Sequence, residues 1–154
     1  MRYNIVEGCD SMNLCIRYFT KSKKGNTKKL SDFISNKLNL EALDVSNNLD
    51  EEVNYLILVN ALYANNIDKE VKVFLENNKD KIKNVVNVCS SASGKSTYKK
   101  VKKECDRLGI NILEDEYHTR ASWIFINKDR PNEDDFNRLA IFIDKIVEKS
   151  ELNG

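Results

Sequence analysis

The chain has 154 residues and a formal net charge of +1, and 41% of its residues are hydrophobic and 32% charged. This length suits one domain with a sizeable core, and the composition excludes a disordered or membrane-embedded chain. No apolar run approaches the roughly 20 residues that a membrane helix needs, and the balanced charge gives no reason to expect nucleic acid as a partner.

Apolar residues alternate along the chain between strand-like runs and helical spacings. In chain order they predict a strand at 13–19, a helix at 27–38, a short strand at 43–45, a buried strand at 53–59, a helix at 67–75, a strand at 84–89 and a helix at 97–108. Residues 110–114 and 123–126 are predicted strand segments separated by a polar interruption, and an amphipathic helix follows Pro131. This alternation implies a parallel sheet with helices on both faces.

Met12 looks like the start of the first strand, so we expect residues 1–11 to form an arm of unknown role and residues 12–150 to form one domain. The arm lacks the pattern of a signal peptide, which favours a cytoplasmic protein. The four cysteines show no C-x-x-C spacing and are expected to be buried reduced thiols. His118 is the only histidine, with no cysteine beside it, so no metal site is predicted.

The loop between the first predicted strand and the first predicted helix reads T-K-S-K-K-G-N-T. Free N–H groups at a helix start, hydroxyl donors and the positive end of the helix dipole all favour a bound phosphate. Gly25 allows the backbone a close approach or a positive φ. The alternative is an ordinary helix start capped by Asn or Thr. The predicted phosphate-binding residues are Thr20, Lys21, Ser22, Lys23, Lys24, Gly25, Asn26 and Thr27.

The order T-x-S-x-x-G-N-T resembles the FMN-phosphate loop of the flavodoxin family, and the resemblance extends from Met12 to about Val147. It implies a short-chain flavodoxin-like α/β fold: a three-layer sandwich around a five-stranded parallel sheet of order 2-1-3-4-5. It also implies noncovalent FMN, bound by loops at the carboxyl ends of the strands. These loops are predicted at 20–27, 60–66 and 90–97.

The second loop resembles the flavodoxin segment that lines one side of the flavin ring, with Tyr63 as the stacking aromatic. The family often carries G-[ST]-P before the hydrophobic-aromatic pair and Gly after it, whereas this chain has other residues there. Asn65 is one of the few residue types besides Gly that adopt a positive φ. The alternative for Tyr63 is an amphipathic rim residue. The predicted flavin contacts here are Ala61, Leu62, Tyr63, Ala64 and Asn65.

The third loop ends in Gly94-Lys95-Ser96, as a nucleotide-binding Walker A loop does. However, Cys89 replaces the first glycine of that motif, and the strand 53–59 is followed by Asn60 rather than the magnesium-holding Asp. We therefore favour this loop as the other wall of a flavin pocket. Tyr98 is either a stacking residue or, more in keeping with its phase, part of the core. The predicted contacts are Ser90, Ser91, Ala92, Ser93 and Gly94.

The resemblance implies an electron carrier in which FMN does the redox chemistry and no side chain is catalytic. Its expected partners are a reductase and an acceptor protein, with no nucleic acid or membrane, and the chain is expected to be a monomer. Flavodoxins are usually strongly acidic, and the net charge of +1 departs from that pattern. Two alternatives therefore stay open: an FMN-dependent NAD(P)H oxidoreductase, and a flavodoxin-fold binding module that has lost FMN.

Overall fold

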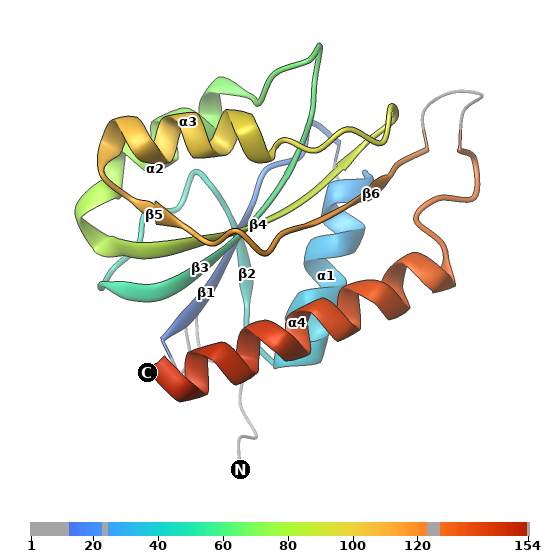
Figure 1. Cartoon of the computed structure of the whole chain (residues 1–154). Coiled ribbons are helices and arrows are strands. Elements are labelled where there is room, and N and C mark those ends of the chain that lie inside the picture. Colours follow the sequence, from blue (N-terminus) through green and yellow to red (C-terminus); the bar gives the residue numbers. More distant parts are fainter. Residues whose placement is uncertain (1–12, 23–24, 123–126, 154) are drawn as a thin grey trace.

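The computed structural model describes residues 13–22, 25–122 and 127–153. Strands and helices alternate along the chain and build three layers (Figure 1). The strands are β1 (Leu14–Tyr18), β2 (Ala42–Asp44), β3 (Val53–Ala61), β4 (Ile82–Ser91), β5 (Asn111–Ile112) and β6 (Tyr117–Arg120). The helices are α1 (Asn26–Leu38), α2 (Lys69–Asn77), α3 (Tyr98–Leu108) and α4 (Glu133–Asn153), with a 3-10 turn, η1, at Lys79–Lys81.

All strand pairs are parallel, and the sheet order is β2-β1-β3-β4-β5, with β6 also paired to β4. Ile57 of β3 lies at the centre, opposite Ile16 of β1 and Val86 of β4, and all three are fully buried. Burial on both faces explains why these strands read as continuous apolar runs. The predicted fold class and strand order are therefore confirmed.

Helices cover both faces of the sheet. Strand side chains alternate between the faces, so Leu14 and Ile16 pack with α1 and α4, whereas Cys15 packs with α2 and α3. Phe33 of α1 contacts Phe136 of α4, with ring centroids 5.1 Å apart. Helices on both faces leave the two ends of the sheet open, and the carboxyl end is where ligands of such folds bind.

The sheet beyond β4 differs from the prediction. Strand β5 covers only two residues, and residues 117–120, predicted as a polar interruption, form β6. Tyr117 and Thr119 are buried while His118 and Arg120 are exposed, as expected of a strand with one face toward the core. A search for a continuous apolar run misses such a strand. The predicted strand 123–126 and the predicted arm 1–11 lie outside the described residues.

The cysteine prediction is partly wrong. Cys89 and Cys105 are free and buried, as expected, but Cys15 is disulfide-bonded. None of the described helices has both the length and the apolar composition needed to span a bilayer.

Candidate functional site

A cavity of about 670 Å³ lies at the carboxyl ends of the strands, and residues of all three predicted loops line it. Its volume is in the range of small-molecule and cofactor sites. The lining residues are Thr20, Lys21, Ser22, Gly25, Asn26, Thr27, Ala61, Leu62, Tyr63, Ala64, Ser90, Ser91, Ala92, Ala121 and Ser122. Because β1, β3 and β4 are adjacent and parallel, loops far apart in the sequence meet here.

The first loop is a compact turn held by its own hydroxyl. The Thr20 Oγ1–H donates to the Ser22 carbonyl at 2.8 Å, and the Ser22 N–H donates back to Thr20 Oγ1 at 3.2 Å. The Gly25 N–H donates to the same carbonyl at 3.0 Å. A Cβ on Gly25 would lie 2.8 Å from Thr20 Oγ1, so the turn has no room for a side chain there. Gly25 has a φ of −73°, and its role is therefore close packing rather than a positive φ.

Gly25 is the N-cap of α1, and no side chain caps this helix. The alternative interpretation of this loop, a cap supplied by Asn or Thr, does not describe the structure. The first turn of α1 also contains no acidic residue. An uncapped helix start without a negative side chain presents its N–H groups and positive dipole end to an anion. Thr27, almost fully buried, lines the cavity at this turn.

Tyr63 of the second loop lines the cavity and packs against Lys21 of the first loop. Its ring meets Phe19 edge to face at a centroid distance of 6.4 Å. The Lys21 Nζ lies 4.3 Å from the centre of the Tyr63 ring, and the Lys21 N–H donates to the Tyr63 hydroxyl at 3.4 Å. These contacts fix the aromatic at the wall of the cavity. Tyr63 remains half-buried, so part of its surface is accessible.

The second loop continues into a tight two-residue turn. The Tyr63 N–H donates to the Asn66 carbonyl at 2.8 Å, and the Asn66 N–H donates to the Tyr63 carbonyl at 2.9 Å. The central residues, Ala64 and Asn65, have φ of 48° and 63°. Both positive values belong to a type I′ turn, and Asn tolerates them much better than Ala. The expected positive φ of Asn65 is present, and Ala64 is a strained position that the sequence did not indicate.

The third loop is anchored by buried polar side chains below the cavity. The Asn60 Nδ2–H donates to Asn87 Oδ1 at 2.8 Å, and the Asn87 Nδ2–H donates to Thr97 Oγ1 at 3.1 Å. All three residues are fully buried. Burial raises the pKa of the Cys89 thiol beside them, which keeps it protonated and a poor nucleophile.

In the segment that resembles a Walker A loop, the hydroxyls of Ser91 and Ser96 form hydrogen bonds within the chain. The Ser91 hydroxyl donates to the Lys95 carbonyl at 2.7 Å, and the Ser96 hydroxyl donates to Glu116 at 2.7 Å. The Ser96 Oγ also accepts the Tyr98 N–H at 2.9 Å. These bonds favour a structural loop over a triphosphate cradle. Tyr98 packs against the core, as the phase of its helix predicts.

The described cavity wall does not include every predicted residue. Lys23 and Lys24 are outside the described residues, and Asn65, Ser93 and Gly94 do not line this cavity. Conversely, Ala121 and Ser122 line it but were not predicted. They follow β6, and recognising that strand from its alternating pattern would have placed them at the carboxyl end of the sheet.

Lys21 is the only charged side chain among the described residues of the cavity wall. No set of His, Cys, Asp and Glu side chains in the described parts of the chain is grouped to hold a metal ion. The cavity therefore offers apolar walls, hydroxyls and N–H donors. Apolar walls suit a flat ring, and the N–H and hydroxyl donors suit an anionic group such as a phosphate.

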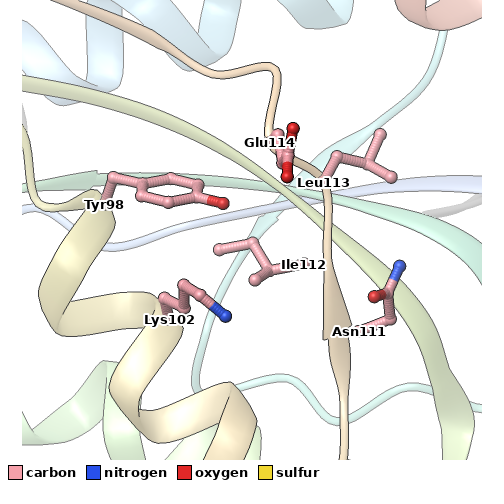
Figure 2. A pocket seen from close by; sticks show the side chains of 6 residues that line it. All are labelled: Tyr98, Lys102, Asn111, Ile112, Leu113 and Glu114. Carbon is pink, nitrogen blue, oxygen red and sulfur yellow. The ribbon is translucent and has the colours of Figure 1, made fainter.

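A second hollow, of about 630 Å³, lies between α3 and the segment 111–114 (Figure 2). Figure 2 shows Tyr98 and Lys102 extending from α3 toward Ile112, Leu113 and Glu114. None of the described residues of the predicted loops lines this hollow.

Several solved structures of other proteins are similar to this one. The structure is similar to oxidised flavodoxin 1 from Bacillus cereus, with a TM-score of 0.63 and 14% identity over 88% of this chain and 97% of that one. A flavodoxin from the domain Archaea gives a TM-score of 0.66 and 12% identity over 90% of this chain and 98% of that one.

The rubredoxin oxygen:oxidoreductase of Desulfovibrio gigas, an anaerobe, gives a TM-score of 0.67 and 12% identity over 94% of this chain and 37% of that one. No family model and no curated protein matches the sequence. The two flavodoxins match over nearly their whole length, in agreement with the strand order of the sheet. The chain therefore has the flavodoxin-like fold.

Proposed function

We propose that this protein binds FMN noncovalently in the cavity at the carboxyl ends of β1, β3 and β4 and acts as an electron carrier. One observation carries the proposal: the uncapped first turn of α1, without an acidic residue, opens into a cavity walled by an aromatic and by small residues. The N–H groups of this turn would hold the phosphate, with the hydroxyl of Thr27 as a further donor. The flavin ring would lie between the Tyr63 loop and residues 90–92.

FMN supplies the reversible redox chemistry of its ring, and the protein binds and orients it. Hydrogen bonds among Thr20, Ser22 and Gly25 fix the shape of the turn that would hold the phosphate. Because the turn is already ordered, less conformational entropy would be lost when FMN binds. Tyr63, held by Lys21 and Phe19, would cover one face of the ring. As part of the same proposal, the protein is a cytoplasmic monomer that takes electrons from a reductase and gives them to an acceptor protein.

Titration of the full chain with FMN tests the proposal, with riboflavin as the matched ligand that lacks the phosphate. We expect FMN fluorescence to be quenched on binding and riboflavin to bind much more weakly. FMN at 100 times its Kd would stabilise the folded chain by about 2.7 kcal/mol, seen as a higher Tm.

The alternatives give different results. A chain that neither quenches FMN nor gains Tm is a binding module that has lost the cofactor. An FMN-loaded chain that consumes NAD(P)H without a protein acceptor is an oxidoreductase rather than a carrier.

A further inference from the structure

A cationic surface adjoins the candidate flavin cavity. We name Lys95, Lys99, Lys100 and Arg120 the basic rim; all four are exposed. The three lysines line a groove of about 520 Å³ that shares Leu62 with the flavin cavity. The same groove shares Gly94 and His118 with a smaller hollow that Arg120 lines. The basic rim thus extends from the cavity mouth toward the edge strand β6.

No ion pair among the described residues neutralises the basic rim: within residues 13–22, 25–122 and 127–153, none of its four members forms one. Glu116 is the one acidic residue among the described groove residues, and its carboxylate already accepts from Ser96 at 2.7 Å and contacts His118 Nδ1 at 2.8 Å. The groove therefore presents a net positive surface, although the whole chain is nearly neutral.

The position of two of these lysines opposes local helix stability. Lys99 and Lys100 lie in the first turn of α3, which contains no acidic residue. The positive end of a helix dipole disfavours cations there. The first turns of α2 and α4, by contrast, carry acidic residues. Violations of a local rule are expected where a surface serves function.

The Arg120 side chain lies against the loop backbone at Gly94. A Cβ built on Gly94 would lie 3.0 Å from Arg120 Cζ, so the guanidinium group lies directly against this glycine. Gly94 has a φ of 80°, a conformation that favours glycine. The loop thus positions the Arg120 charge beside the lysine groove.

We propose that the basic rim is the docking surface for the acidic face of a partner redox protein. This inference rests on the proposed function, because a partner bound here would lie next to the flavin at Leu62. Charge complementarity selects an acidic partner: four unpaired cations steer an acidic surface and repel a basic one. Because all four cations are exposed, the attraction is long-ranged and sensitive to salt.

The test is binding of the full chain to an acidic plant-type [2Fe–2S] ferredoxin, with cytochrome c as the basic counterpart. Isothermal titration at 20 and 200 mM NaCl should show ferredoxin binding that weakens about tenfold or more as salt increases, and no binding to cytochrome c. A preference for cytochrome c, no binding to ferredoxin, or an affinity for ferredoxin that does not depend on salt would overturn the proposal.

A matched pair of double variants locates the surface. Lys99→Glu/Lys100→Glu should lose about tenfold in ferredoxin affinity while keeping or raising Tm, because glutamate suits the first turn of α3. Lys79→Glu/Lys83→Glu makes the same change in net charge around the amino end of β4, and its ferredoxin affinity should stay within about twofold of the parent. Equal losses in both variants would overturn the assignment.

FMN titration of the same variants separates this inference from the proposed function, since neither lysine pair lines the flavin cavity. If Lys99→Glu/Lys100→Glu changes neither FMN affinity nor ferredoxin binding, docking at the basic rim is overturned and the proposed FMN site stands. Ferredoxin docking at the basic rim without any FMN binding would overturn the proposed cofactor alone. NADPH oxidation that Lys99→Glu/Lys100→Glu abolishes, with ferredoxin binding intact, would assign the groove to dinucleotide phosphates and overturn protein docking.

Discussion

Asn26 and Ser122, 96 positions apart in sequence, hydrogen-bond each other in both directions. The Asn26 Nδ2–H donates to the Ser122 carbonyl at 3.0 Å, and the Ser122 hydroxyl donates to Asn26 Oδ1 at 3.2 Å. This pair ties the first turn of α1 to the segment after β6, and both residues line the candidate cavity. The Asn26 side chain is therefore a structural tie, and its contribution to a phosphate is expected through the backbone N–H.

Asn26→Ala should lower the stability of the fold and weaken the binding of both flavins. Loss of both bonds is expected to lower the free energy of unfolding by about 1–2 kcal/mol in urea denaturation, and to weaken FMN and riboflavin equally. Ser122→Ala removes only the bond that the hydroxyl donates, so its effect should be smaller. A selective loss of FMN in Asn26→Ala would instead show that the side chain contacts the phosphate.

Thr27→Val tests the phosphate turn itself. The substitution keeps the shape of the side chain and removes its hydroxyl, so FMN affinity should fall about tenfold, the equivalent of one hydrogen bond to a charged group. Riboflavin lacks the phosphate and should bind the variant as it binds the parent. Fluorescence titration of both flavins gives the two affinities, and equal losses would contradict the assignment of the phosphate to α1.

Ala64→Gly addresses the strained turn of the second loop. Ala64 has a φ of 48°, which costs an alanine about 1–2 kcal/mol, and glycine removes most of that cost. Since glycine also gains freedom in the unfolded chain, we expect a net rise in stability of up to about 1 kcal/mol. Ala140→Gly, the same change inside α4, should instead lose about 1 kcal/mol. A stability loss in Ala64→Gly comparable to that of Ala140→Gly would show that the turn carries no strain.

Asn87→Leu tests the buried polar chain below the third loop. Without the Asn87 amide, the Thr97 hydroxyl loses its partner in the interior, whereas the Asn60 amide keeps the Leu58 and Val88 carbonyls as acceptors. The loss should cost about 1–3 kcal/mol in unfolding free energy. Adding Thr97→Val removes the orphaned hydroxyl and should recover part of the loss. Strict additivity of the two substitutions would show that Asn87 and Thr97 do not interact.

The fold could be predicted because the chain uses simple signals. The central strands are buried on both faces, so the sequences around Ile57 and Val86 are apolar runs interrupted only by isolated polar residues. The turn that we propose to hold the phosphate could be located because small and hydroxyl residues stand between a predicted strand and a predicted helix. Both features are local in sequence, and their positions in the fold follow from the topology of a parallel sheet.

Other parts of the site depend on long-range contacts that no local pattern encodes. The Asn26–Ser122 pair and the Asn60–Asn87–Thr97 chain join residues of different elements, and nothing in their own neighbourhoods marks them as partners. Isolated asparagines within apolar strands were the available signal for the second group, because a buried amide needs a partner. The positive φ of Ala64 had no signal, since alanine does not mark a turn.

The carboxylate of Asp135 should make the free energy of unfolding depend on pH. It lies in the first turn of α4, and its carboxylate accepts from the Arg130 guanidinium at 2.7 Å and from the Asn132 N–H at 2.8 Å. Burial acts to raise the pKa of Asp135, but these hydrogen bonds prevail and hold it below the ordinary value of 3.8. A carboxyl with a lowered folded pKa stabilises the fold above its unfolded pKa, and this contribution is lost as pH falls through the folded pKa.

Asp135→Asn should therefore be less stable than the parent by about 1–3 kcal/mol at pH 7, and the difference should shrink as pH falls below about 4. Urea denaturation at a series of pH values gives this difference directly. Asp134→Asn is the matched control, because Asp134 forms an exposed ion pair with Arg138 whose loss changes stability by less than about 1 kcal/mol. A difference between Asp135→Asn and the parent that stays constant from pH 7 to pH 3 would show that Asp135 acts through packing and not through its charge.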